Sequence, residues 1–147
     1  MNKQRLWITG GLIFLVVVLT FSLVPQSARA QEGTVAIIRI FCHPSASHKL
    51  IIEPETAHIA PGAVVAWWNK DRGREVKVQF LEGKECAVGS SAPTGFRLES
   101  QQCYTTSRMP PGGISSLKFD QEGTYEFEVA YKDVGKRKGK VVVRKRE

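Results

Sequence analysis

Histidine is scarce in this chain, with three residues among 147: His43, His48 and His58. No Gly-x-Ser-x-Gly, His-Glu-x-x-His or P-loop pattern occurs, so the familiar motifs for a nucleophile, a zinc protease or a phosphate cradle are missing. Carboxylate pairs such as Glu53 and Glu55 lie two residues apart in strand-like segments, and solvated strand faces explain them better than acid–base chemistry. We therefore expect a protein that is not an enzyme.

Charge is absent from a long stretch near the N-terminus. Lys3 and Arg5 precede the apolar run Leu6–Val24, and an Ala28-x-Ala30 cleavage pattern follows. This order is typical of an export signal. The run would also span about 28 Å as a helix, close to the thickness of a bilayer core. Residues 1–30 are therefore expected to be a signal peptide or an uncleaved membrane anchor with its N-terminus in the cytoplasm, and residues 31–147 an exported domain on the periplasmic or extracellular side.

Cysteine is also scarce, with Cys42, Cys86 and Cys103. The absence of a Cys-x-x-Cys-His pattern excludes covalent haem. Because exported proteins fold in an oxidising compartment, a disulfide is expected. We predict the pair Cys86–Cys103, since both lie in one loop-rich region. Cys42 would then be a buried thiol or an intermolecular link.

Acidic residues are few near the C-terminus, where basic residues concentrate. Residues 1–30 hold three of the 21 basic residues and none of the 14 acidic ones, so the formal charge of the remaining chain falls only from +7 to +4. A local basic cluster in an exported protein indicates either a solvated edge or a docking face for an acidic protein surface or anionic lipid headgroups. No nucleic-acid recognition motif occurs. The cluster comprises Lys132, Lys136, Arg137, Lys138, Lys140, Arg144, Lys145 and Arg146.

What the chain has in abundance is β-strand pattern. β-branched and aromatic residues alternate with polar ones between Gly/Pro turn signals, which predicts an all-β Greek-key sandwich of seven or eight strands. Residues 82–109 are long and polar, with Phe96–Leu98 as a short strand or helical turn. Trp67 shares a face with Val65 and is expected in the core, whereas Trp68 points to the opposite face as an interface anchor or a residue covered by the 82–109 segment. The expected strands are Thr34–Phe41, Leu50–Ile52, Val64–Asn69, Glu75–Leu81, Ile114–Phe119, Thr124–Tyr131 and Gly139–Arg144.

Three sequence blocks resemble the cupredoxins, the plastocyanin- and amicyanin-like blue-copper proteins. The C-terminal block matches the hairpin in which Gly-x-Tyr-x-Phe leads to the copper-ligating loop and then to Gly-x-Val-x-Val. The other two match a Pro-Gly…Phe…Gly-x-Tyr block and an N-terminal block that ends in Val-x-Trp-x-Asn. The matching residues are Gly123, Tyr125, Phe127, Gly139, Val141 and Val143; Pro111, Gly112 and Phe119; and Glu53, Pro54, Ile59, Gly62, Val65, Trp67 and Asn69.

The same resemblance shows that the copper ligands are replaced. Val129 stands at the position of the family's Cys, Lys132 at a His and Arg137 at the Met. The remaining His position falls on Val76, or on Glu75 if a bulge shifts the register. A type-1 copper site needs a thiolate, imidazoles and a thioether, and these side chains cannot provide it. We therefore expect no cofactor.

The resemblance implies a fold that is associated with electron-transfer systems. We expect a copper-free binding or scaffold protein, an accessory subunit of a membrane respiratory or photosynthetic complex. Its partner would be a membrane protein complex or an acidic protein surface, contacted through Lys132, Lys136, Arg137, Lys138 and Trp68. The alternative function is a copper-binding electron carrier or chaperone that uses Cys42, His43 and His48 as ligands.

Overall fold

The computed structural model describes residues 34–43, 49–81, 89–99, 103–131 and 135–145. In this part of the chain there are eleven strands and no long helix. The strands are β1 (Val35–Cys42), β2 (Leu50–Glu53), β3 (Thr56–Ile59), β4 (Ala63–Asn69), β5 (Val76–Phe80), β6 (Ser90–Thr94), β7 (Phe96–Leu98), β8 (Tyr104–Thr106), β9 (Ile114–Phe119), β10 (Gly123–Tyr131) and β11 (Gly135–Val143).

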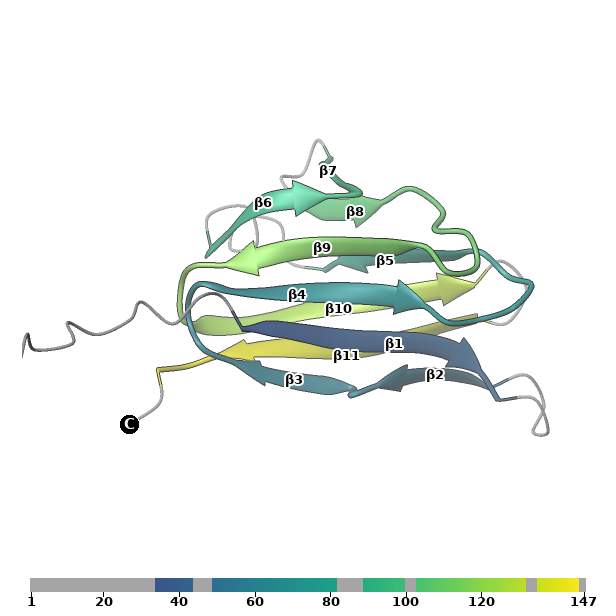
Figure 1. Cartoon of the computed structure of the whole chain (residues 1–147), viewed down its shortest axis with the longest axis horizontal. Helices are drawn as coiled ribbons and strands as arrows, with labels where there is room; N and C mark the ends of the chain where they lie inside the picture. Colours follow the sequence, from purple (N-terminus) through teal and green to yellow (C-terminus); the bar gives the residue numbers. More distant parts are fainter. Residues whose placement is uncertain (1–33, 44–48, 82–88, 100–102, 132–134, 146–147) are drawn as a thin grey trace, which may run out of the picture.

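Two mixed sheets pack face to face as a Greek-key sandwich (Figure 1). One sheet has five strands in the order β2-β1-β4-β9-β6, and the other has six in the order β3-β11-β10-β5-β8-β7. The pairs β1–β4 and β3–β11 are parallel, and the other pairs are antiparallel. The chain changes sheet between β2 and β3, at Pro54, because proline cannot continue a ladder with its missing N–H. The predicted all-β sandwich is confirmed.

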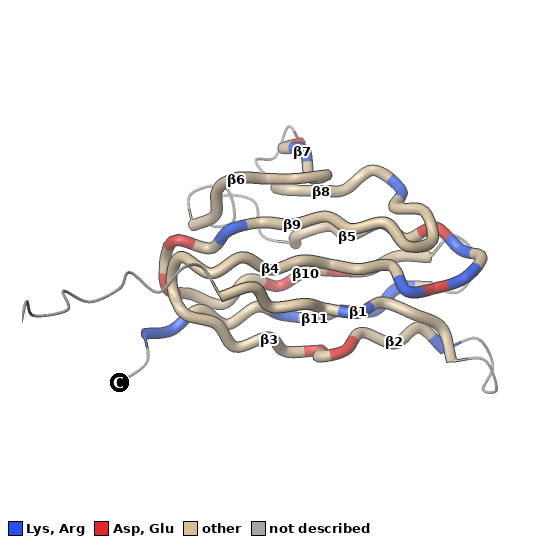
Figure 2. The backbone as a smooth tube through the Cα atoms, in the orientation of Figure 1, with Lys and Arg blue, Asp and Glu red and all other residues tan. Residues whose placement is uncertain are grey.

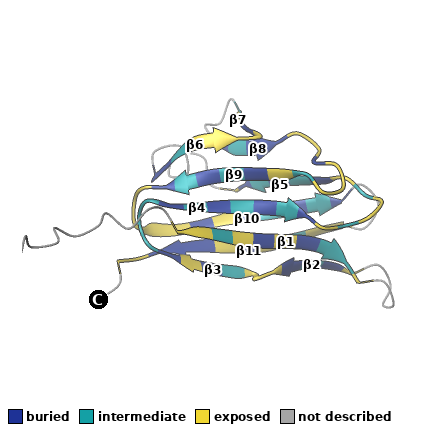
Figure 3. Cartoon of the chain, in the orientation of Figure 1, coloured by how far each residue is buried: buried dark blue, intermediate teal, exposed yellow. Residues whose placement is uncertain are grey.

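The core lies between the sheets and is built from alternate residues of each strand (Figure 3). At its centre the fully buried Trp67 makes edge-to-face contacts with Phe80, Phe96 and Phe127, with ring centroids 5.2–5.6 Å apart. Such pairs contribute about 0.5–1.5 kcal/mol each beyond the burial of their area. The prediction that Trp67 faces inward is confirmed.

The number of strands exceeds the predicted seven or eight. Within the polar segment 82–109, the described residues contain β6, β7 and β8, and Phe96 is a core residue. The sequence predicted only Phe96–Leu98 as a short element of this segment; β6 and β8 were missed because they are short and polar, and β6 and β7 are edge strands. Of the two structures considered for Phe96–Leu98, the short strand is the one observed.

The C-terminal hairpin is tighter than the sequence predicted. β11 begins at Gly135, which pairs with Tyr131, whereas the predicted strand began at Gly139. Gly135 has φ near +110°, a conformation that glycine adopts without steric cost, and it is the residue at which pairing with β10 begins. Lys136 and Lys138 therefore lie on a strand and not in a loop.

The expected leader, residues 1–30, lies outside the described residues. Among the residues that the structure does describe, no helix is long and apolar enough to cross a membrane. The choice between a cleaved signal and an anchor stays a prediction.

Candidate functional site

Asn69, the last residue of β4, organises the end of the sandwich where the copper loops of the resembled family would lie. It is fully buried. Its side-chain Nδ2 donates to the carbonyl oxygens of Arg74 (2.8 Å) and Met109 (3.0 Å), and its Oδ1 accepts from the backbone N–H of Asp71 (3.1 Å). One amide thus holds the β4–β5 turn and the segment before β9 together.

Asp71 is the polar centre of this turn. One carboxylate oxygen accepts from the backbone N–H groups of Gly73 (3.0 Å) and Arg74 (3.1 Å). The other accepts from the Cys42 N–H (3.2 Å) and the Tyr131 hydroxyl (3.3 Å). The ends of β1 and β10 and the β4–β5 turn therefore converge on one carboxylate.

The electrostatics follow from these contacts. Partial burial opposes ionisation of Asp71, but the N–H donors of Gly73, Cys42 and Arg74 outweigh it, so the pKa of Asp71 lies below its usual value. Burial, and then the charge of Asp71, raise the pKa of both the Cys42 thiol and the Tyr131 hydroxyl. The shift disfavours the thiolate form of Cys42, which is the form that binds metals and attacks electrophiles.

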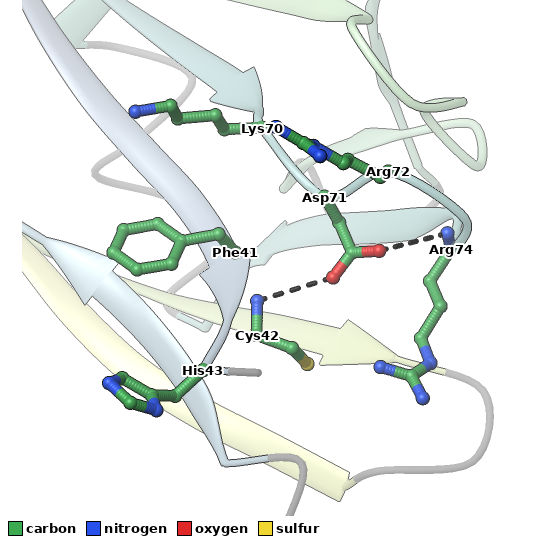
Figure 4. Close-up of a pocket in the computed structure, with 7 residues that line it drawn as sticks. All are labelled: Phe41, Cys42, His43, Lys70, Asp71, Arg72 and Arg74. Carbon is green, nitrogen blue, oxygen red and sulfur yellow. Dashed lines mark hydrogen bonds between the residues drawn. The ribbon is translucent and has the colours of Figure 1, made fainter. Parts of the chain in front are cut away.

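A cleft of about 540 Å³ opens beside this network. Figure 4 shows the Asp71 carboxylate in its wall, between the backbone nitrogens of Cys42 and Arg74, with the Lys70 side chain directed away from it. The cleft is lined by three basic side chains, Lys70, Arg72 and Arg74, and by one carboxylate, that of Asp71, which already accepts hydrogen bonds. Its lining residues are Phe41, Cys42, His43, Lys70, Asp71, Arg72 and Arg74.

The positions that the sequence resemblance aligned with copper ligands are occupied by core and cross-sheet residues. Val76 and Val129 are fully buried, and they lie opposite Tyr131 and Val78 in the β5–β10 ladder. Their side chains belong to the hydrophobic core. They offer no donor atom, so this part of the chain does not fit a type-1 copper ion. Lys132 lies outside the described residues.

Arg137, at the predicted position of the methionine, fastens the two sheets together. Its Nη1 donates to the Leu50 carbonyl of β2 (3.1 Å), and its Nη2 forms an ion pair with Glu55 (2.6 Å). The planar guanidinium of an arginine can donate to two acceptors at once. The thioether of a methionine at this position would have no N–H to donate. Arg137 was predicted to contact a partner, and the structure gives it contacts within the domain.

The other predicted contact residues differ in how they are held. Lys136 pairs with Glu128 on the neighbouring strand (2.8 Å), yet its side chain remains 67% exposed. Lys138 is exposed on β11. Trp68 is half-buried on the outer face of the five-stranded sheet, with the Lys70 ammonium 5.9 Å from its ring centroid. A partner contact at these three residues stays a prediction.

The alternative metal site and the disulfide fall partly outside the described residues. Cys42 and His43 adjoin at the end of β1, but His48 is not described, and the described residues contain no group of three His, Cys, Asp or Glu side chains placed to hold a metal. Cys103 is buried just before β8, and Cys86 is not described. The Cys86–Cys103 bridge stays a prediction.

The structure is similar to solved structures of amicyanin. A reduced copper(I) form, at pH 4, of an amicyanin with a proline-to-glycine substitution has a TM-score of 0.50 and 21% identity, over 75% of this chain and 82% of that chain. The fold is cupredoxin-like. A copper(I) form of a methionine-to-alanine amicyanin has a TM-score of 0.49, with the same identity and coverage. No protein-family model matches the chain, and no curated protein matches its sequence.

The comparison confirms the cupredoxin resemblance at the level of fold. Sequence reasoning missed the network at the end of this cupredoxin-like domain. An Asp-x-Gly turn directly after a strand is a signal for the side-chain-to-backbone bonds of Asp71. The contacts of Asp71 with Cys42 and Tyr131 had no such signal, since they join residues 29 and 60 positions apart.

Proposed function

We propose that this chain is a copper-free protein of cupredoxin-like fold that serves as a binding or scaffold subunit on the exported side of a membrane, as an accessory subunit of an electron-transfer complex. Its role is contact, not catalysis or electron transfer through copper.

The observation that carries the proposal is the state of the ligand positions. Val76 and Val129 are 0% exposed and fill the core, and Arg137 binds a backbone carbonyl and a carboxylate across the sheets. Restoring a copper site would require replacing both the donors and the packing. The fold is retained, but Val76, Val129 and Arg137, the aligned positions that the structure describes, supply no soft ligand set.

The polar network supports the same conclusion. In place of a ligand loop, this end of the sandwich has Asp71 bonded to Tyr131 and to backbone N–H groups. Burial and the charge of Asp71 raise the pKa of the Cys42 thiol beside this network, so a metal would have to displace the thiol proton in order to bind there. The network gives the end a fixed shape, which favours recognition by a partner.

The basic surface at this end supplies the contact. Exposed Lys70 and Arg72 lie in the β4–β5 turn, and Lys136 and Lys138 lie on the first residues of β11 (Figure 2). This end is opposite to Val35, where the N-terminal segment enters β1 (Figure 1). A chain held in the membrane by Leu6–Val24 therefore presents these cations away from its attachment. An acidic protein surface is the complementary partner.

The test is capture of the partner from native membranes with the tagged full-length chain at low and high salt. The variant Arg72→Glu with Lys138→Glu reverses charge at the proposed end and spares Arg137, which the fold needs. The matched control, Arg144→Glu, makes the same change at an exposed site at the opposite end.

We expect the double variant to lose most of the partner recovered at low salt, and the control to retain it. High salt should weaken capture by the wild-type chain, because exposed charges are screened within about 10 Å at 0.1 M. Equal recovery by both variants at low salt would refute a contact through this end.

A further inference from the structure

The cleft beside the Asp71 network has more positive than negative charge in its lining. Its basic residues are Lys70, Arg72 and Arg74, and among the described residues Asp71 is the only acidic one that lines it. Three cations against one carboxylate leave a formal excess of two positive charges. The cleft volume of about 540 Å³ lies within the roughly 300–1,000 Å³ that is typical of small-molecule sites.

Asp71 has no hydrogen-bonding capacity left for these cations. An ionised carboxylate offers about four lone-pair sites. The two oxygens of Asp71 already accept from four donors: the backbone N–H groups of Gly73, Arg74 and Cys42 and the Tyr131 hydroxyl. The carboxylate therefore holds the β4–β5 turn in place, and it attracts the neighbouring cations only through its charge.

Lys70 and Arg72 differ from the paired cations of the surface. Within the described part of the chain, neither side chain forms an ion pair, and both are exposed. The Lys70 ammonium lies 5.9 Å from the centroid of the Trp68 ring, a contact that does not neutralise its charge. The cleft thus offers two cations to an anion from solution. The described cations that do form ion pairs are Arg39, Lys77, Lys118, Lys136 and Arg137.

The cleft also has an aromatic wall. Phe41, near the end of β1, is half-buried and lines it. Figure 4 shows the side chains of Phe41 and Lys70 extending to the same side of Asp71, and that of Arg74 to the other. A single oxyanion would leave most of the volume and the Phe41 ring unused. A ligand that joins an anionic group to an apolar body matches both parts of the lining.

We propose that this cleft binds a small organic carboxylate, whose anionic group pairs with Arg72 and Lys70 and whose apolar body packs on the Phe41 ring. The planar guanidinium of an arginine matches the two oxygens of a carboxylate. Arg74, on the other side of Asp71, adds its charge to the field in the cleft. This site is independent of the proposed function, because it takes a free small molecule and is tested on the purified chain without a partner.

The first experiment titrates the isotope-labelled full-length chain, in mild detergent, with three probes and follows its backbone amide signals by NMR. The first probe, 2-naphthoate, joins a planar apolar ring to one carboxylate. The second, 2-naphthamide, has nearly the same shape without the charge, and the third, inorganic phosphate, has the charge without the ring. We expect 2-naphthoate to saturate one site that shifts the signals of Cys42, Asp71 and Gly73, and the other two probes to bind at least about tenfold more weakly.

Each other outcome of this titration overturns the proposal. If 2-naphthamide bound as tightly as 2-naphthoate, the cations would take no part in binding. If phosphate bound as tightly, the apolar wall would take no part. Shifts that do not saturate, or that saturate at residues elsewhere in the chain, would show that the cleft is not a site for such a ligand.

The second experiment repeats the 2-naphthoate titration on variants. Arg72→Gln removes one of the two exposed cations, and the control Arg97→Gln makes the same change at an exposed residue of β7 that does not line the cleft. We expect Arg72→Gln to weaken binding about tenfold, as for the loss of one hydrogen bond to a charged group, and the control to bind like the wild type. Amide signals that match the wild type away from the cleft verify the fold of each variant. Equal affinities of the two variants would refute the proposal.

Discussion

Replacing Asn69 with alanine is the most informative change at the end of the sandwich. Asn69 is fully buried, and its amide makes all its hydrogen bonds to backbone groups of other segments. Alanine leaves the Arg74 carbonyl and the Asp71 N–H without their side-chain partner, and removes one acceptor contact from the Met109 carbonyl. That carbonyl keeps its bond from Val76 N–H (3.0 Å).

The magnitude follows from these contacts. A typical intramolecular hydrogen bond contributes about 1 kcal/mol net, and a buried group left unpaired costs about 1–3 kcal/mol. Two of the three bonds are only partly buried, so water replaces some of what is lost. We expect Asn69→Ala to lower the free energy of unfolding by about 3 kcal/mol, a large share of the roughly 5–15 kcal/mol of a typical domain.

Urea unfolding followed by tryptophan fluorescence measures this change, because Trp67 passes from a fully buried site to water. Gln79→Ala is the control; Gln79 lies on the outer face of β5, and its truncation should change stability by less than about 0.5 kcal/mol. If Asn69→Ala were no more destabilising than the control, Asn69 would not hold the β4–β5 turn as described.

Three further predictions concern neighbouring features. The pKa of Asp71 is lower in the folded state than its ordinary value, so ionised Asp71 stabilises the fold above the ordinary pKa, and this stabilisation is lost as the pH falls through the folded pKa. Asp71→Asn should therefore be less stable than the wild type at pH 7 and should lose less stability in acid. Urea unfolding at several pH values measures this, and parallel plots of unfolding free energy against pH for the two proteins would contradict it. Gly139→Ala should cost roughly 1–3 kcal/mol, since a Cβ there would lie 2.5 Å from the Phe127 ring, whereas Gly73→Ala meets nothing within 4 Å; equal melting temperatures would exclude the clash. Arg137→Met, which installs the resembled family's thioether, should destabilise the domain by about 1–3 kcal/mol through loss of the contacts with the Leu50 carbonyl and the Glu55 carboxylate. Thermal unfolding that shows stabilisation would refute the role of these contacts.

The fold was predictable because the sequence patterns that specify its strands and its closing hairpin lie within short segments of the chain. Alternation of apolar residues placed Trp67 in the core, and the Gly123–Val143 pattern located the closing hairpin. The boundary at Gly135 was missed because three basic residues follow it, and basic residues in a row look like a loop in sequence. On an outer strand face they are solvated as well as they would be in a loop.

The site was only half predictable, for a different reason. That valines occupy positions 76 and 129 can be read from the sequence, whereas what surrounds them depends on contacts between distant segments. Asp71 meets Tyr131 across 60 residues, and Arg137 reaches Leu50 across 87. A single sequence contains no pattern for such pairs.

Copper loading of the purified full-length chain tests the central claim most directly. After incubation with Cu(I) and Cu(II) and removal of unbound metal, copper content and visible absorption would be measured for the wild type and for Cys42→Ser. Because the described residues contain no soft ligand set, we expect no stoichiometric copper and no intense thiolate-to-copper absorption in either protein. One tightly held copper per chain with that absorption in the wild type would contradict the account; its loss in Cys42→Ser would assign the metal to Cys42 and its neighbours.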